Sequence, residues 1–294
     1  MQLASSDPPG SSVRPSPFPA LVAYSVAFVL TGLASAAFVF AVALSRTGGR
    51  RSGLAAEATA FALSAPGMIG GALAGAIVLA SVAFVAAALE RKPVLDRLRL
   101  GPTRATPLGT VGVSTGLVGL SFATGTLAGL LGLRGGGVMD ALAESLESPA
   151  PARLLAAILA IGVAPAFAEE TFFRGLLQPR FAASWGRWPA IVAAAAAFGL
   201  IHLSGLQGSL ALLAGLFLGW SAERLGGIRP TIVAHMVNNL VFLGLAAIGS
   251  IDAPSRAAEI AIVLVGGAVS IASIAVLRSG RAVKAVNDAP GIPA

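Results

Sequence analysis

The chain has 294 residues, of which 56% are hydrophobic and only 11% charged, and its mean hydropathy is +0.85. Soluble domains carry about 25% charged residues, so this composition excludes a soluble globular protein and predicts a polytopic membrane protein. The chain has no cysteine, which excludes disulfides and thiolate metal sites, and its net charge of +7 comes without a basic run interleaved with aromatic residues, so we expect no nucleic-acid partner.

A tail and eight apolar segments make up most of the chain. Residues 1–19 are rich in Pro and Ser, and we expect them to be disordered. Each apolar segment approaches the ~20 residues that a membrane-crossing helix needs. The segments are residues 20–44, 67–89, 108–133, 154–179, 188–204, 209–223, 231–249 and 258–277. The predicted fold class is therefore all-α, a membrane bundle of about eight transmembrane helices, of which the fifth and sixth are the shortest.

The Lys and Arg residues predict the orientation of this bundle. With eight spans, 13 of the 20 lie on the side that holds both chain ends, six lie on the other side, and Arg174 lies within a span. Cytoplasmic loops carry the excess of positive charge. We therefore expect a multi-pass protein of the cell membrane, with the lipid bilayer around it and both termini in the cytoplasm.

The fourth apolar segment carries an acid pair and an arginine in the stretch AFAEETFFRGLLQPR, residues 166–180. A charge at the centre of a bilayer costs at least ~2.5 kcal/mol, so such groups are usually paired and functional. Glu170 and Arg174 are four residues apart and can form an ion pair on one helix face. Glu169 points about 100° away around the helix and needs a partner on another helix. A purely structural ion pair would explain Glu170 and Arg174 but leaves Glu169 without a role.

Both histidines of the chain, His202 and His235, lie in later apolar segments. Phe198 stands four residues before His202, and Asn239 four residues after His235, so each pair shares a helix face. Hydrogen-bonded packing residues and polar contacts between helices are the alternative explanation for each pair. Because every histidine lies in an apolar segment after the acid pair, we interpret acids, arginine and histidines as one site.

The depths of these residues pose a problem for a shared site. Counting ~1.5 Å per residue from the cytoplasmic ends places Glu169 at ~16 Å, His202 at ~21 Å and His235 at ~7 Å. The three can meet only if the fifth segment begins deeper in the membrane or the helices tilt strongly.

Three motifs now stand in order: EETFFR, FGLIH and HMVNN, that is EExxxR, FxxxH and HxxxN. Together they resemble the motifs of the CAAX protease and bacteriocin-processing (CPBP) family of intramembrane proteases, also called the Abi family. We accordingly divide the chain into the tail 1–19, two transmembrane helices with a cytoplasmic interfacial segment at 20–107, a CPBP-like protease core at 108–250, and the last helix with a cytoplasmic tail at 251–294.

The resemblance implies an endopeptidase that cleaves a membrane-associated protein or peptide. In the eukaryotic branch of the family the substrate is lipidated, because that branch trims prenylated CAAX proteins. Peptide hydrolysis needs an activated water, a group that polarises the carbonyl, and a proton for the leaving amine. In a metal-free version, Glu169 is the general base, His202 holds the water, and His235 and Asn239 stabilise the oxyanion. In a metalloprotease version, Glu169, His202 and His235 hold Zn²⁺, which activates the water. Glu170, Arg174 and Phe198 support the site in both.

Two other functions compete with proteolysis. A non-catalytic scaffold or bacteriocin-immunity protein of the same family would keep the motifs for stability, and a proton-coupled transporter would use the buried charges as a relay. No inverted repeat of the acidic segment occurs elsewhere in the chain, which disfavours the transporter.

Overall fold

The computed structural model describes residues 15–90, 93–133, 150–248 and 255–284, which form helices without a β-strand among them. Predicted helical segments and observed helices agree, which confirms the all-α fold class. The elements are α1 (Phe18–Arg46), α2 (Leu54–Ala62), α3 (Ala65–Ala88), α4 (Val94–Arg97), α5 (Pro107–Leu130), α7 (Pro151–Ala157), η1 (Ile158–Val163), α8 (Ala164–Glu169), η2 (Glu170–Leu177), α9 (Gln178–Trp185), α10 (Arg187–Leu200), α11 (Gly205–Leu225), α12 (Arg229–Ala247), α13 (Arg256–Arg278) and η3 (Gly280–Ala282).

Within the described residues, seven helical segments are long and apolar enough to cross a membrane. They are α1, α3, α5, the continuous segment Pro151–Trp185, α11, α12 and α13. The remaining predicted span, the fifth at residues 188–204, corresponds to α10, whose 14 residues reach only ~21 Å of the ~30 Å hydrocarbon core. The apolar run is interrupted because Leu203 adopts a positive φ of 52° and the Ser204 side chain caps the start of α11. The expected eight spans are thus seven long segments and one short helix.

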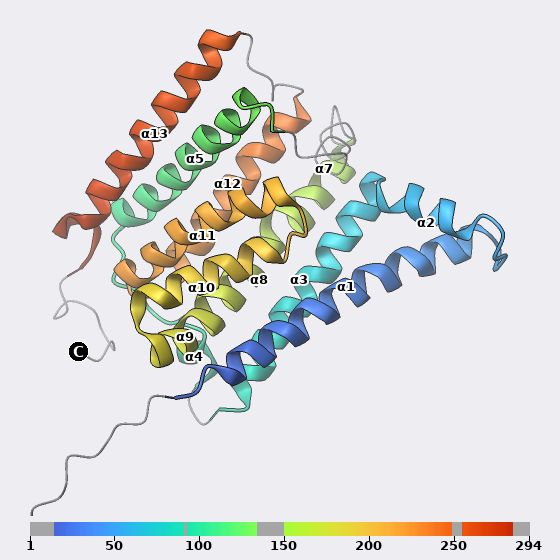
Figure 1. Ribbon diagram of the computed structural model, residues 1–294, viewed down its shortest axis with the longest axis horizontal. Helices are drawn as coiled ribbons and strands as arrows, with labels where there is room; N and C mark the ends of the chain where they lie inside the picture. The colour runs from blue at the N-terminus through green and yellow to red at the C-terminus, as the bar shows by residue number, and fades with distance from the viewer. Residues whose placement is uncertain (1–14, 91–92, 134–149, 249–254, 285–294) are drawn as a thin grey trace, which may run out of the picture.

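The helices form a staggered row in Figure 1, from α13 and α5 through α12, α11 and α10 to α3 and α1. The strongest contacts join α13 to α5, α1 to α3, α10 to α11, and α12 to α5. The segment Pro151–Trp185 runs through the middle, where α8 and η2 pack against α3. Its residues Phe172, Phe173 and Leu176 are fully buried in the main hydrophobic core.

Small residues bring α5 and α13 close together. A Cβ at Gly119 would lie 2.7 Å from the Gly266 carbonyl oxygen, so only glycine allows this approach. The Ser270 hydroxyl donates a hydrogen bond to the Gly116 carbonyl across the same contact. In a lipid bilayer the hydrophobic effect does not drive helices together. Close backbone packing and hydrogen bonds between helices stabilise their association instead.

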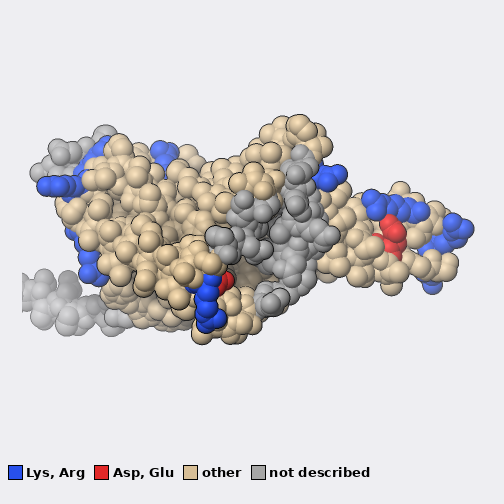
Figure 2. Space-filling view, turned by 90° about the horizontal axis from the view of Figure 1, so that it is seen from above, with Lys and Arg blue, Asp and Glu red and all other residues tan. Residues whose placement is uncertain are grey.

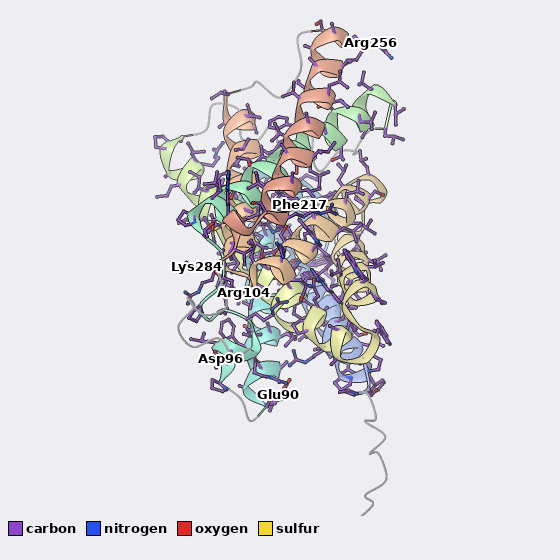
Figure 3. All side chains as sticks on the ribbon, turned by 90° about the vertical axis from the view of Figure 1, so that its left-hand side faces the viewer. Glu90, Asp96, Arg104, Phe217, Arg256 and Lys284 are labelled. Atoms are coloured by element: carbon purple, nitrogen blue, oxygen red, sulfur yellow. The ribbon has the colours of Figure 1, made fainter. Side chains whose placement is uncertain are left out.

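The loops predicted on the positive side meet at one end of the bundle. Figure 3 shows Glu90, Asp96, Arg104 and Lys284 at this end and Arg256 at the other. The contacts that join the loops are those of Pro15 with Ser184, Glu90 with Arg97 and Arg180, Arg99 with Glu223, and Arg104 with Leu225 and Lys284. Both ends of the described chain therefore lie at one end of the bundle, here called the loop end. The compartment that it faces stays a prediction.

The surface agrees with a membrane environment. Figure 2 shows uncharged residues over most of one face, with most Lys and Arg gathered toward its two ends. Large hydrophobic side chains are exposed on the long helices, such as Ile271 at 71% and Leu264 at 67% on α13. Lipid tails can cover such side chains, whereas water would disfavour so many of them.

Candidate active site

The helix that carries the acids is broken by two π-helical stretches, η1 before the acids and η2 from Glu170 onward. Pro165 contributes to the first, because proline has no N–H to donate to the preceding turn and its ring crowds the carbonyl of Ile161. π-Helical turns leave backbone carbonyls without their usual partners and occur frequently at functional sites. Glu169 and Glu170 thus lie at the junction between α8 and η2.

The two acids have different surroundings. Arg174 Nη1 donates a hydrogen bond to Glu170 Oε1 at 2.7 Å, and both side chains are fully buried, so the predicted ion pair is present. The Glu169 side chain is 17% exposed, and its nearest cationic or imidazole group is Nε2 of His235, 3.7 Å from Oε2. One acid is therefore held by an arginine, and the other keeps a carboxylate that a small molecule can reach.

His235 joins the two acids. Its Nδ1 lies 3.2 Å from Glu170 Oε1, and its Nε2 faces Glu169. Because the Glu170 carboxylate can only accept, we assign the Nδ1 proton to this bond, so Nε2 of a neutral ring carries no proton and lies near Glu169 without a hydrogen bond to it. The predicted partner for Glu169 on another helix is thus His235 of α12.

Phe198 is the common neighbour of the remaining groups. The guanidinium carbon of Arg174 lies 4.5 Å from the centre of its ring, a cation–π contact. The rings of His202 and His235 meet the same ring edge-on, at centroid distances of 5.1 and 5.9 Å. His202 Nδ1 also donates to the Phe198 carbonyl at 2.9 Å. Residues expected at different depths therefore converge on one phenyl ring.

Asn239 points away from the acids. Its amide nitrogen lies 3.4 Å from the carbonyl oxygens of both Ile161 and Gly162 in η1. Ile161 is the residue whose carbonyl loses its donor because of Pro165. Asn239 supplies a replacement donor, so a role at the oxyanion would require its amide to leave η1.

The donors do not form a complete zinc site. Among the described residues, no three His, Asp or Glu side chains are grouped so that they could hold one metal ion. Glu169 and His235 could both reach an ion, and the bond from His202 Nδ1 to the Phe198 carbonyl leaves Nε2 of His202 free, but the three side chains are not grouped around one point. Zn²⁺ needs at least three protein ligands in a catalytic site. The metal-dependent version stays a prediction, and no step below runs through it.

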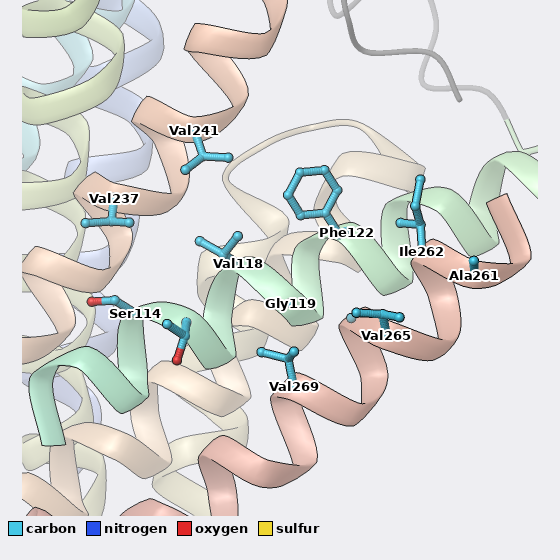
Figure 4. Close-up of a pocket in the computed structure, with 12 residues that line it drawn as sticks. Ser114, Val118, Gly119, Phe122, Val237, Val241, Ala261, Ile262, Val265 and Val269 are labelled. Carbon is cyan, nitrogen blue, oxygen red and sulfur yellow. The ribbon is translucent and has the colours of Figure 1, made fainter. Parts of the chain in front are cut away.

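A separate apolar pocket of about 680 Å³ lies behind α12, between α5 and α13. Figure 4 shows Val237 and Val241 of α12 facing Val118 and Phe122 of α5. Two positions separate Val237 from His235, so these side chains leave α12 on opposite sides. The pocket is therefore not part of the polar site.

A polar cluster buried inside a bundle of apolar helices defines a membrane protein with an intramembrane reaction or transport site. Residues 151–241 match the family described as type II CAAX prenyl endopeptidase, Rce1-like, which confirms the resemblance of the motif-bearing segment to the CPBP family. The match supports an intramembrane protease function in general, acting in the bilayer on a membrane-associated substrate. No curated protein and no solved structure matches the chain.

Sequence reasoning missed Gln178, one turn beyond Arg174 and 1% exposed. Its amide nitrogen donates to the Gly219 carbonyl at 3.0 Å and to Glu223 Oε1 at 2.8 Å. The spacing of four residues from Glu170 to Arg174 to Gln178 is the signal that could have identified it.

Proposed function

We propose that this protein is an intramembrane endopeptidase in which Glu169 activates the attacking water. The observation that supports it is the unequal environment of two adjacent acids. Glu170 is fixed by Arg174 and orients His235, whereas Glu169 faces His235 and remains accessible. A general base needs such a reachable carboxylate within about one water of the reacting group.

The reaction follows from these positions. Glu169 takes a proton from the water molecule while the water oxygen adds to the scissile carbonyl carbon. When the C–N bond breaks, Glu169 gives that proton to the nitrogen of the leaving amine. His235 Nε2 and His202 Nε2 are free to orient the water, because each ring uses Nδ1 for another bond. The substrate is a membrane-associated protein or peptide, and its lipidation is a separate question.

Loss of cleavage in Glu169→Gln tests the proposal. This variant keeps the shape of the side chain and removes the base, so we expect cleavage to fall by at least ~100-fold. Membrane and released peptides from cells that express wild type, Glu169→Gln and the control Glu259→Gln are compared by quantitative mass spectrometry. Glu259 lies in the first turn of α13, outside the site. An unchanged peptide pattern in Glu169→Gln at equal protein level would favour the scaffold or the transporter.

Metal analysis separates the two versions of the mechanism. Because no three His, Asp or Glu side chains in the described part of the chain are grouped to hold one ion, we expect cleavage to persist in the presence of a chelator. Purified protein is analysed for zinc, treated with chelator and assayed with and without added Zn²⁺. Stoichiometric zinc, with activity lost on chelation and restored by add-back, would establish the metalloprotease version instead.

A further inference from the structure

Polar contacts continue from the site toward the loop end. Glu170, Arg174 and Gln178 follow one another at intervals of four along η2 and the start of α9. Gln178 bonds to Glu223 of α11, and Glu223 Oε1 accepts a hydrogen bond from Arg99 Nη1 at 2.6 Å. Buried polar side chains thus follow one another from the ion pair to Gln178, and Gln178 is bonded to Glu223, whose side chain is 24% exposed at the loop end. We call Glu170, Arg174, Gln178 and Glu223 the polar column.

Several buried atoms of this column have no hydrogen-bond partner among the described residues. They are Nε and Nη2 of Arg174, Oε1 of Gln178 and Oε2 of Glu170. Arg174 and Gln178 are 0% and 1% exposed. Buried polar groups are nearly always hydrogen-bonded to protein or to ordered water, so each of these atoms calls for a partner. Donors of Arg174 and the acceptor of Gln178 stand along the same helix face.

Two glycines of α11 give these atoms space. A Cβ at Gly215 would lie 3.2 Å from Arg174 Nη2, and a Cβ at Gly219 would lie 2.7 Å from Gln178 Oε1. The two glycines are one helical turn apart, so their faces are ~5–6 Å from each other. An unpaired donor and an unpaired acceptor therefore lie against the same glycine surface, about one turn apart on α11, and ordered water bonded to them would satisfy both.

We propose that Arg174, Gln178 and the Gly215–Gly219 surface bind ordered water, and that the polar column is a rear route by which water reaches the site from the loop end. The route rests on the proposed function, since hydrolysis uses one water per turnover and the hydrocarbon core supplies none. A peptide lying against Glu169 covers the accessible side of the site. The column leads instead from Glu223 of α11 at the loop end to Glu170, which bonds to His235.

A high-resolution structure tests the water site independently of activity. Cryo-electron microscopy or crystallography of the wild-type protein should show ordered water bonded to Arg174 Nη2 and Gln178 Oε1. In Gln178→Met, which removes the acceptor at similar length, this water should be lost while the Arg174–Glu170 pair remains. Wild-type density in which protein groups alone satisfy Arg174 and Gln178 would overturn the proposal.

Kinetics test the route. We expect Gln178→Met to lower kcat about tenfold, the scale of one lost hydrogen bond, with an unchanged KM. The matched control is Gln207→Met in the first turn of α11, away from the column. A merely structural role would lower thermal stability or raise KM. If the variant loses the ordered water yet keeps wild-type kcat, the rear route is wrong. If Glu169→Gln is fully active while the water is present, the proposed function fails and the water site stands.

Discussion

Glu169 and Glu170 are adjacent and chemically identical, but they contact different groups and therefore have different roles. Glu170 accepts from Arg174 Nη1 and from His235 Nδ1, so its charge is committed to two neighbours. Glu169 has neither bond and is partly accessible. The difference arises from a 100° rotation between successive helical residues, which directs one carboxylate to the buried arginine and the other to Nε2 of His235 on α12.

At this scale we expect Glu170→Gln to destabilise the protein. The change leaves Arg174 as a buried charge without its partner, a loss of roughly 3–5 kcal/mol. Adding Arg174→Gln removes that charge, so the double variant should regain part of the stability but none of the cleavage. Thermal unfolding in detergent and cleavage rate are measured for both, with Glu169→Gln as the stable, inactive reference. A stable, inactive Glu170→Gln beside an unfolded Glu169→Gln would mean that the two acids have the opposite roles.

Sequence spacing predicted the contacts within a helix but not those between helices. The Glu170–Arg174 pair follows from four-residue spacing on one helix face. The position of His235 between both acids depends on how α12 packs against α8, which no local pattern encodes. The Phe198 ring likewise meets Arg174 and His235 only through the packing of α10, whereas its contact with His202 follows from the four-residue spacing.

At the scale of elements, the depth count from ideal spans misled for two reasons: the helix that carries the acids has π-helical stretches, and His202 follows a short helix, α10, rather than a full span. A uniform rise of ~1.5 Å per residue places the acids and histidines at different levels. The wider turns of η1 and η2 change both the rise and the rotation of the helix that carries the acids. Pro165 was visible in the sequence, but the contact that Asn239 of α12 makes with the carbonyls of η1 was not.

A double-mutant cycle tests the pairing of Asn239 with η1. Asn239→Ala should cost about 1 kcal/mol of stability, because the Ile161 carbonyl loses its replacement donor. In a Pro165→Ala background the backbone N–H at position 165 can serve that carbonyl, so the same change should cost little. Thermal unfolding of the four proteins gives the coupling.

The same four proteins also test whether Asn239 stabilises the oxyanion. Cleavage rates of the same four proteins are compared with their stabilities. If Asn239→Ala leaves stability unchanged and lowers kcat by about 100-fold or more, the scale of one lost oxyanion donor, the amide acts on the substrate and its contact with η1 is incidental.

At the scale of the whole molecule, composition and positive charge predicted which loops share one end of the bundle. The contacts of Pro15, Glu90, Arg99 and Arg104 join the segments that the count of Lys and Arg had grouped together. The length of α10 was not predictable from hydropathy, because the two polar residues His202 and Ser204 are too few to end the apolar segment, yet the backbone turns there. The polar column was not predicted from the sequence, because Gln178 and Glu223 belong to different helices and their contact depends on how these helices pack.

The absence of native cysteine allows the orientation to be tested with single cysteines. Ser16 and Gly280 lie at the loop end, whereas Ser52 and Ser255 lie in the segments that precede α2 and α13 at the other end, and all four are exposed. If the excess of positive charge marks the cytoplasmic side, an impermeant maleimide added to intact cells should label Ser52→Cys and Ser255→Cys but neither Ser16→Cys nor Gly280→Cys. All four should react after permeabilisation, which controls for exposure. Labelling of Ser16→Cys and Gly280→Cys from outside would reverse the orientation, and the polar column would then open toward the cell exterior.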